Sequence, residues 1–290
     1  MTCAGNCRWA GDCYSARMAD TQLFSALLKY WRGQRGMSQL DLALSADVSS
    51  RHVSFLESGR ARPSEDMVLR QLATLGVPLR DQNAMLRAAS FAARFQEPTL
   101  DAMEPSIDFA LARMLHQQEP FPMVVMNLAY DVLRTNGAAQ TVFSQFVLTS
   151  AYVPAPLNLY ALVFDPQLAR PFIQNWPAVG QHMVARLHRE ALSRPNDGRL
   201  WALLERVLAF PGVPQAWRQP DFSRASEPTF SLVLERGPLS LRFFMVVTAF
   251  AAPQQVTLEE LRLESYFPAD DATRLVCERL AVYYSQLNSK

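Results

Sequence analysis

Lysine is almost missing from this chain of 290 residues, which has only Lys29 and the terminal Lys290. Enzymes that form a Schiff base or bind nucleotide phosphates through a phosphate loop need a lysine inside a folded site, so both classes are disfavoured. The patterns GxSxG, HExxH, GxGxxG and CxxC are also absent. They would have marked a serine hydrolase, a zinc peptidase, a dinucleotide-binding fold and a paired-cysteine site. We therefore do not expect an enzyme.

Long apolar runs are lacking as well. The longest, residues 243–252, is too short to cross a bilayer, and the first residues have no signal-peptide core. We expect a cytoplasmic protein without membrane insertion. The formal net charge is +1, so a surface that binds nucleic acid would have to be a local feature.

Cysteine and histidine are scarce and poorly placed for metal binding. Cys3, Cys7 and Cys13 fit none of the usual zinc or iron–sulfur spacings, and no histidine lies near them. We expect residues 1–20 to be a disordered tail, with a metal site as the weaker alternative. His182 and His188 are six residues apart and would lie on different faces of a helix, so they do not form a metal pair.

Residues 37–64 carry the clearest motif, two short helices joined by a tight turn. Ser38 is a good N-cap for the first helix, and Ser49 or Ser50 can cap the second. Val53 and Leu56, three residues apart, give the second helix one buried stripe. Gly59 is placed to end that helix in the left-handed backbone region. The remaining face is mostly polar, as a surface that meets base edges would need to be.

This stretch resembles the XRE-type helix-turn-helix of phage repressors and their bacterial relatives. The resemblance is carried by Gln39, Ala43, Val48, Ser49, Glu57, Gly59 and Pro63. An ordinary helical hairpin would not require these residues in register. A fifth helix is expected at about residues 79–93. The resemblance implies an all-α domain of five helices over residues 21–95, and an ion pair between Arg32 of the first helix and Glu57 of the recognition helix. Near the motif, basic residues outnumber acidic ones. The basic residues are Lys29, Arg32, Arg35, Arg51, Arg60 and Arg62.

The resemblance also implies how double-stranded DNA would be bound. Arg51 is the candidate for reading guanine, because its planar guanidinium matches O6 and N7. Gln39 and Ser58, helped by Arg60 and Arg62, would hold phosphates. The full set of residues expected at the DNA is Gln39, Ser49, Ser50, Arg51, His52, Ser54, Phe55, Ser58, Arg60 and Arg62.

The second half of the chain changes character. Residues 96–120 read as a linker with a connecting helix, and residues 121–290 as an α+β domain with an antiparallel sheet covered by helices. Strands are expected at residues 123–128, 131–135, 229–235, 240–250 and 261–267, and helices at 107–118, 136–147, 158–164, 168–176, 179–192, 198–209 and 270–287. Two strands, several helices, three strands and a helix is the order of a PAS-like sensor domain.

Four stretches of this domain resemble the C-terminal ligand-binding domain of MmyB-like regulators. They are residues 122–139, Asn158-Leu159 with Phe164 and Pro166, residues 212–221, and residues 261–273. The resemblance implies a PAS-like ligand-binding domain, with a long-chain fatty acid as one possible ligand. Arg218 and Gln219 follow Trp217 where other branches carry a histidine, and this departure allows an effector different from theirs.

Aromatic residues are dense in this domain, and a packed core accounts for most of them. A sheet covered by helices can also enclose an apolar cavity. The residues expected to line such a cavity are Phe143, Leu159, Met183, Phe230, Leu232, Phe244, Val246 and Tyr266.

These patterns together predict a transcriptional regulator that binds DNA as a homodimer and senses a small apolar or amphipathic effector, with no cofactor and no metal. Two alternatives stay open. One is an antitoxin-like protein whose C-terminal region binds a partner, which the length and aromatic content of that region disfavour. The other is an enzyme fused to the helix-turn-helix, which the missing catalytic motifs disfavour.

Overall fold

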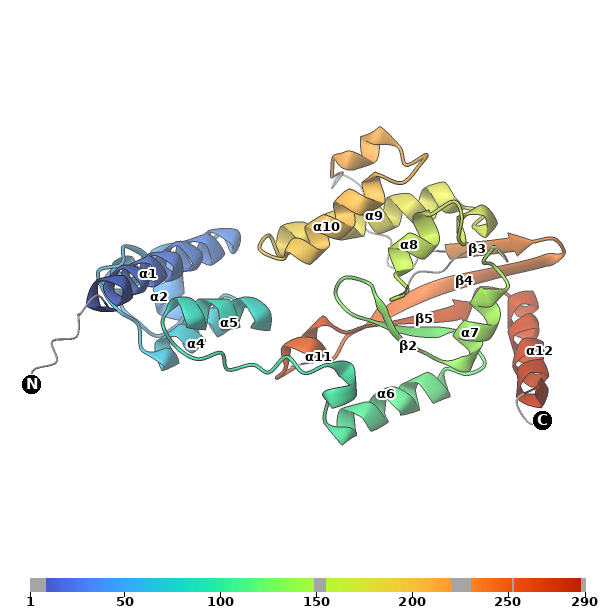
Figure 1. Cartoon of the computed structure of the whole chain (residues 1–290), viewed down its shortest axis with the longest axis horizontal. Coiled ribbons are helices and arrows are strands. Elements are labelled where there is room, and N and C mark those ends of the chain that lie inside the picture. Colours follow the sequence, from blue (N-terminus) through green and yellow to red (C-terminus); the bar gives the residue numbers. More distant parts are fainter. Residues whose placement is uncertain (1–8, 149–154, 221–230, 252, 288–290) are drawn as a thin grey trace, which may run out of the picture. The chain divides into compact units, whose positions relative to one another are not determined.

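The computed structural model describes residues 9–148, 155–220, 231–251 and 253–287, and Figure 1 shows the course of the chain. The chain divides into two compact units. The first contains residues 1–97 together with 252–259, and the second contains 98–251 together with 260–290. Within the described residues no helix is both long and apolar enough to cross a membrane.

The first unit is helical, as expected. Its first five helices are α1 (Trp9–Gln34), α2 (Gln39–Ser45), α3 (Ser50–Glu57), α4 (Glu65–Thr74) and α5 (Leu79–Ala88). Ser38 and Asp41 form a capping box at α2, and Ser49 caps α3 through the backbone N–H of His52. Gly59 has a φ of +70°, a conformation that costs glycine little, and it follows α3 directly after its C-cap. The helix-turn-helix therefore has the geometry that its capping residues predict.

Two helix ends differ from expectation. The proposed disordered tail is wrong from Trp9 onward, because α1 begins there; residues 9–20 contain no proline and only one glycine, so nothing in their sequence ends the helix. The expected fifth helix, extending to residue 93, ends at Ala88 because Ser90 adopts a φ of +66°. The amide of buried Asn83 then binds the backbone of Arg94 and Phe95, which holds the following segment in place.

The core of the first unit is formed by side chains that every helix contributes. Phe24, Leu28 and Trp31 of α1 are at most 1% exposed. The other buried members include Leu42, Ala43, Val53, Leu56, Val68, Leu72, Met85 and Leu86. Because α3 buries Val53 and Leu56 here, its opposite side is left at the surface.

The second unit is built on a five-stranded antiparallel sheet with the strand order β2-β1-β5-β4-β3. The strands are β1 (Met123–Met126), β2 (Val132–Thr135), β3 (Ser231–Arg236), β4 (Leu239–Thr248) and β5 (Arg262–Pro268). β3 and β4 form a hairpin that turns at Gly237, whose φ is +59°. The expected α+β architecture is confirmed, and the two N-terminal strands pair with the C-terminal three through β1 and β5.

Helices and short 3-10 turns connect and cover the strands (Figure 1). They are η1 (Leu100–Ala102), α6 (Pro105–Gln117), α7 (Gly137–Ser144), α8 (Leu159–Phe164), η2 (Arg170–Phe172), α9 (Trp176–Ser193), α10 (Gly198–Leu208), η3 (Gln215–Arg218) and α12 (Asp271–Leu287). Asn136 and Asn158 cap α7 and α8. The expected helix over residues 168–176 is wrong: only the turn η2 forms there, and the backbone of Ile173 pairs with Leu234 of β3 instead.

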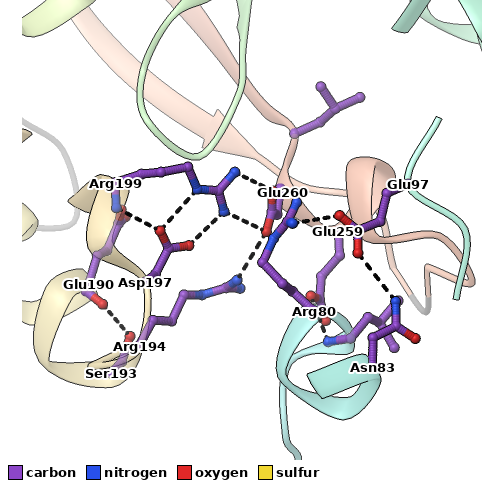
Figure 2. A network of polar contacts seen from close by, with 12 residues as sticks. Arg80, Asn83, Glu97, Glu190, Ser193, Arg194, Asp197, Arg199, Glu259 and Glu260 are labelled. Carbon is purple, nitrogen blue, oxygen red and sulfur yellow. Dashed lines mark hydrogen bonds and ion pairs between the residues drawn. The ribbon is translucent and has the colours of Figure 1, made fainter. Parts of the chain in front are cut away.

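One helix was not expected from the sequence. Between β4 and β5 the chain forms α11 (Val256–Glu260), and residues 252–259 belong to the first unit. Buried Val256 donates its N–H to Gln96, and Glu259 accepts a hydrogen bond from the N–H of Leu79 at the start of α5. In the second unit, Glu260 accepts from Arg199 (Figure 2). One of the three points at which the chain passes from one unit to the other therefore lies between the consecutive residues Glu259 and Glu260.

Candidate functional site

The outward side of α3 is the candidate DNA-binding surface. Ser50 and Arg51 are exposed on its first turn, and the guanidinium of Arg51 lies over the ring of Phe55, 5.2 Å from its centroid. The inward side is fixed, since Val53 and Leu56 are fully buried and the Ser25 hydroxyl donates to the Leu56 carbonyl. A rigid helix thus presents one arginine and one aromatic ring together.

The other residues expected at the DNA lie on or near this helix and differ in their exposure and hydrogen-bond partners. Ser49 is occupied as the N-cap of α3, and the Ser58 hydroxyl donates to the Phe55 carbonyl. The Nε2 atom of His52 lies 2.8 Å from the sulfur of Met67 on α4, so the imidazole leans toward that helix. Ser54 is half-buried, and Arg60 and Arg62 are exposed on the loop after α3.

An ion pair joins α1 to the last residue of α3. Arg32 contacts Glu57 through two nitrogens, at 2.6 Å and 3.0 Å, and the two side chains are only 15% and 5% exposed. Gln39 donates its amide N–H to the same carboxylate at 2.7 Å. Burial raises the pKa of Glu57, but the hydrogen bonds from Arg32 and Gln39 outweigh it and lower that pKa overall. The Gln39 amide nitrogen, expected at a phosphate, is thus engaged with Glu57.

Arg35 has a structural task as well. It donates to the carbonyls of Leu75 and Gly76 at the C-terminal end of α4, where a cation is favoured by the helix dipole. Its guanidinium also lies 5.7 Å from the ring centroid of Trp31. Of the basic residues noted in the sequence, Arg32 and Arg35 therefore make contacts that hold the domain together, although Arg35 is exposed. Arg51, Arg60 and Arg62 are exposed on or beside α3.

A cavity of about 380 Å³ lies in the second unit between the sheet and its helices. This volume is in the range of small-molecule sites. Strands β1, β2, β3 and β5 contribute to its wall, together with α7, α8 and the segments around them. The lining residues are Val124, Val132, Thr135, Ala139, Gln140, Phe143, Ser144, Phe146, Val147, Leu157, Leu159, Leu162, Val163, Ala169, Ile173, Leu232, Leu234 and Tyr266. Most of these side chains are apolar.

Four of the expected lining residues are in this wall, namely Phe143, Leu159, Leu232 and Tyr266, and Met183 lines a smaller adjoining cavity. Phe230 lies outside the described residues. Phe244 and Val246 do not line either cavity: Phe244 stacks on Phe267, and Val246 is 39% exposed.

The placement of Phe244 and Val246 was wrong because of the hairpin register. Leu232 is paired with Phe243, and residues directly opposite each other in an antiparallel pair face the same side. The inward positions of β4 are therefore Leu241, Phe243 and Met245. Phe244 and Val246 alternate with them and point to the other face.

The smaller cavity contains polar residues that the sequence did not single out. It measures about 40 Å³ and is lined by Tyr130, Tyr160, His182, Arg186 and Glu264 beside its apolar wall. Helical spacing on α9 places Arg186 on the same side as Val179 and Met183. The signal was a glutamate at a buried position of a strand, β5.

No group of three metal-ligating side chains occurs within the part of the chain that the structure describes. Cys3 and Cys7 lie outside that part. Cys277 is buried on α12, and burial raises the pKa of its thiol to about 11, so it is not a reactive thiolate near neutral pH.

Comparison with known proteins gives two family matches. Residues 107–280, more than half of the chain, match the model of the MmyB-like transcription regulator ligand binding domain. Residues 28–82 match a helix-turn-helix model. Both agree with the resemblances seen in the sequence. No curated protein matches the chain.

Two solved structures are similar to the chain. The clp gene regulator ClgR from Corynebacterium glutamicum is 24% identical with a TM-score of 0.22, over 35% of this chain and 95% of its own. An RNA-binding light-oxygen-voltage receptor is 11% identical with a TM-score of 0.28, over 97% of this chain and 67% of its own. At such TM-scores neither similarity bears on the function, which rests on the two family matches.

Proposed function

The chain belongs to the family of the MmyB-like transcription regulator ligand binding domain, and on this premise we propose that it is a ligand-responsive, dimeric regulator of an operator. That it is a DNA-binding transcription regulator is indicated by the helix-turn-helix at residues 28–82 in front of the ligand binding domain. The proposal adds how DNA is bound, what kind of molecule the second unit holds, and that the molecule changes DNA affinity.

DNA binding is assigned to α3 in the major groove. Arg51 would read a base, because it is exposed, carries a planar donor pair and is supported by the ring of Phe55. Arg60 and Arg62 are exposed beside the helix and would contact phosphates. A single helix-turn-helix reads one half-site, so we propose a homodimer on a two-fold operator.

The cavity between the sheet and α7–α8 is the observation that carries the ligand proposal. A well-packed core leaves few voids larger than a water molecule, whereas this one measures about 380 Å³. If a water-sized group fills about 30 Å³, the cavity holds on the order of a dozen non-hydrogen atoms. A small apolar or amphipathic molecule fits these limits, and a fatty acid is one such molecule that the family resemblance implies.

The effector acts by binding two states of the protein unequally, because a ligand with equal affinity for both would change nothing. Extraction of the purified full-length protein with organic solvent, followed by mass spectrometry, tests for a bound amphipath. Adding the extracted compound back should change operator affinity measured by fluorescence anisotropy. A protein that yields no small molecule, and whose operator affinity no apolar compound changes, would contradict the proposal.

A further inference from the structure

A smaller cavity, which we call the polar cavity because several polar side chains join apolar ones in its wall, adjoins the large apolar one. The two share the lining residues Leu159, Val163, Leu232 and Tyr266. The small cavity measures about 40 Å³, room for roughly one to three non-hydrogen atoms. An apolar chamber beside a small polar one fits an amphipathic molecule with a compact head group.

The polar side chains come from several elements around the cavity. Glu264 and Tyr266 are two apart on β5 and point to the same face of the sheet. Arg186 lies on α9, where the buried residues Val179 and Met183 mark the inward side. His182, Tyr130 and Tyr160 complete the polar part of the wall.

The charge of Arg186 is already matched. Arg186 donates to Glu190 at 3.1 Å, and the hydroxyl of Tyr130 donates to the same carboxylate at 2.9 Å. The guanidinium also lies over the ring of Tyr130, 5.3 Å from its centroid. Arg186 is therefore neutralised by a residue of its own helix and is not an unmatched cation waiting for an anion.

Glu264 adds a second acid. It is 4% exposed, and the hydroxyl of Tyr266 donates to its Oε1 at 2.6 Å. A carboxylate has two oxygens and about four acceptor positions, so one donor does not saturate it. Burial raises the pKa of Glu264 despite the hydrogen bond from Tyr266 and the charge of Arg186, so its surroundings already disfavour negative charge.

A ligand carboxylate in this cavity would be the third acid around one guanidinium. Like charges that lie close together repel strongly inside a protein. A hydroxyl or an amine would instead donate to Glu264, and an ammonium group would also balance the second acid.

We propose that the polar cavity binds the head group of the effector through Glu264 and selects a hydrogen-bond donor without negative charge, a hydroxyl or an amine, over a carboxylate. This inference rests on the proposed ligand-binding function and narrows the class of effector. The apolar tail of the effector would occupy the larger cavity.

Three probes with the same apolar chain test the proposal: dodecanol, dodecylamine and dodecanoate, with binding to the full-length protein measured near neutral pH by calorimetry. We expect dodecanol or dodecylamine to bind at least about tenfold more tightly than dodecanoate. Tighter binding of dodecanoate would overturn the selectivity and leave the ligand cavity in place. No binding of any probe would contradict both the selectivity and the proposed function.

The Glu264→Gln variant separates the head-group effect from a structural one. It removes the acid and keeps an amide of similar size, so dodecanoate should bind about tenfold more tightly than to the parent, and the selectivity should shrink. Glu235→Gln, at an exposed position of β3, makes the same change in net charge at a residue that does not line the cavity, and it should leave all three affinities unchanged. Thermal unfolding of each variant shows that it is folded. Unchanged selectivity in a folded Glu264→Gln variant would remove Glu264 from the head-group site.

Discussion

Arg32 and Glu57 form a two-point ion pair in which Nε and one terminal nitrogen of the guanidinium contact the two carboxylate oxygens at 2.6 Å and 3.0 Å. The remaining terminal nitrogen donates to the carbonyl of Met37, and Gln39 donates to Glu57. The pair therefore connects α1, the start of α2 and the end of α3. Both side chains are mostly buried, so this pair differs from solvent-exposed ion pairs, which contribute little to the stability of a protein.

Removing one partner should destabilise the first unit more than removing both. Glu57→Ala would leave the Arg32 guanidinium largely buried without its anion, and we expect a loss of about 3 kcal/mol. Hydrogen exchange of the α3 amides in the full-length chain measures this locally, since unfolding of a two-unit chain need not be two-state. A double-mutant cycle that combines Glu57→Ala with Arg32→Ala gives the interaction free energy between the two side chains. Strict additivity of the two single variants would show that the pair is not coupled.

The same carboxylate predicts a pH dependence. The pKa of Glu57 is lowered in the folded state: burial raises it, but the hydrogen bonds from Arg32 and Gln39 and the charge of Arg32 lower it by more. Its contribution is then fully present above the unfolded-state pKa of about 4.3 and is lost as the pH falls through the lower folded-state value. The free energy of α3 opening, from amide exchange corrected for intrinsic rates, should fall below about pH 4. Glu57→Gln should show a smaller decline, and an equal decline would exclude Glu57 as its source.

Arg51 and Arg60 should differ in the kind of DNA contact they make. Arg51→Ala should cost about 1–3 kcal/mol on the operator and relax preference at one base position. Arg60→Ala should weaken operator and random DNA alike and reduce the salt slope by about one unit. Anisotropy titrations of both sequences at several salt concentrations measure these effects. Parent-like binding by both variants would refute this docking of α3.

Glu259 gives a fourth prediction. It accepts from the N–H of Leu79, and Pro78, the N-cap residue of α5, makes no side-chain cap hydrogen bond. Glu259→Ala should lower the protection of the α5 amides by about 1 kcal/mol, and Glu259→Gln, which keeps an acceptor, by less.

Because residues 252–259 join β4 to β5, Glu259→Ala should also reduce the effect of a ligand on operator affinity while ligand affinity itself stays unchanged. A parent-like ligand response, measured by operator anisotropy with and without ligand, would show that this contact does not couple the two functions.

Local signals in the sequence predicted most of the fold. Ser38, Ser49, Ser64, Asn136 and Asn158 all cap the helices that follow them, since capping depends on a residue and its next few neighbours. The order of strands and helices likewise follows from periodicity within each segment. The features that we did not predict from the sequence depend on contacts between residues that are far apart in the chain.

The helix α11 is one such case, because its five residues are too few for a periodic pattern, and its contacts are with Gln96 and Leu79. The lining of the cavity is another. Alternation shows that Phe244 and Val246 share a face of β4, but only the pairing of Leu232 with Phe243 decides which face is inward. The polar cavity could not be predicted either, because Arg186 of α9 and Glu264 of β5 are brought together only by the folded structure.

The last prediction compares a residue that lines the cavities of the second unit with a control residue that does not. Val163 on α8 is 8% exposed and lines both cavities, whereas Val246 on β4 is 39% exposed and lines neither. The larger ring in Val163→Phe should occupy space that the ligand needs and lower affinity for the bound amphipath by at least about tenfold. Filling an existing cavity avoids most of the strain of overpacking, so operator affinity of the free protein should stay within about twofold of the parent.

Val246→Phe makes the same substitution at a partly exposed position and should change neither affinity. Ligand binding is measured by calorimetry and operator binding by anisotropy, with thermal unfolding to show that both variants fold; Ala139→Leu, which also enlarges a lining side chain, is the substitute if Val163→Phe does not fold. Folded cavity variants that bind the ligand as tightly as the parent would show that the effector does not occupy this cavity. Equal losses in Val163→Phe and Val246→Phe would point to a general effect on the sheet, because only the first position adjoins the cavity.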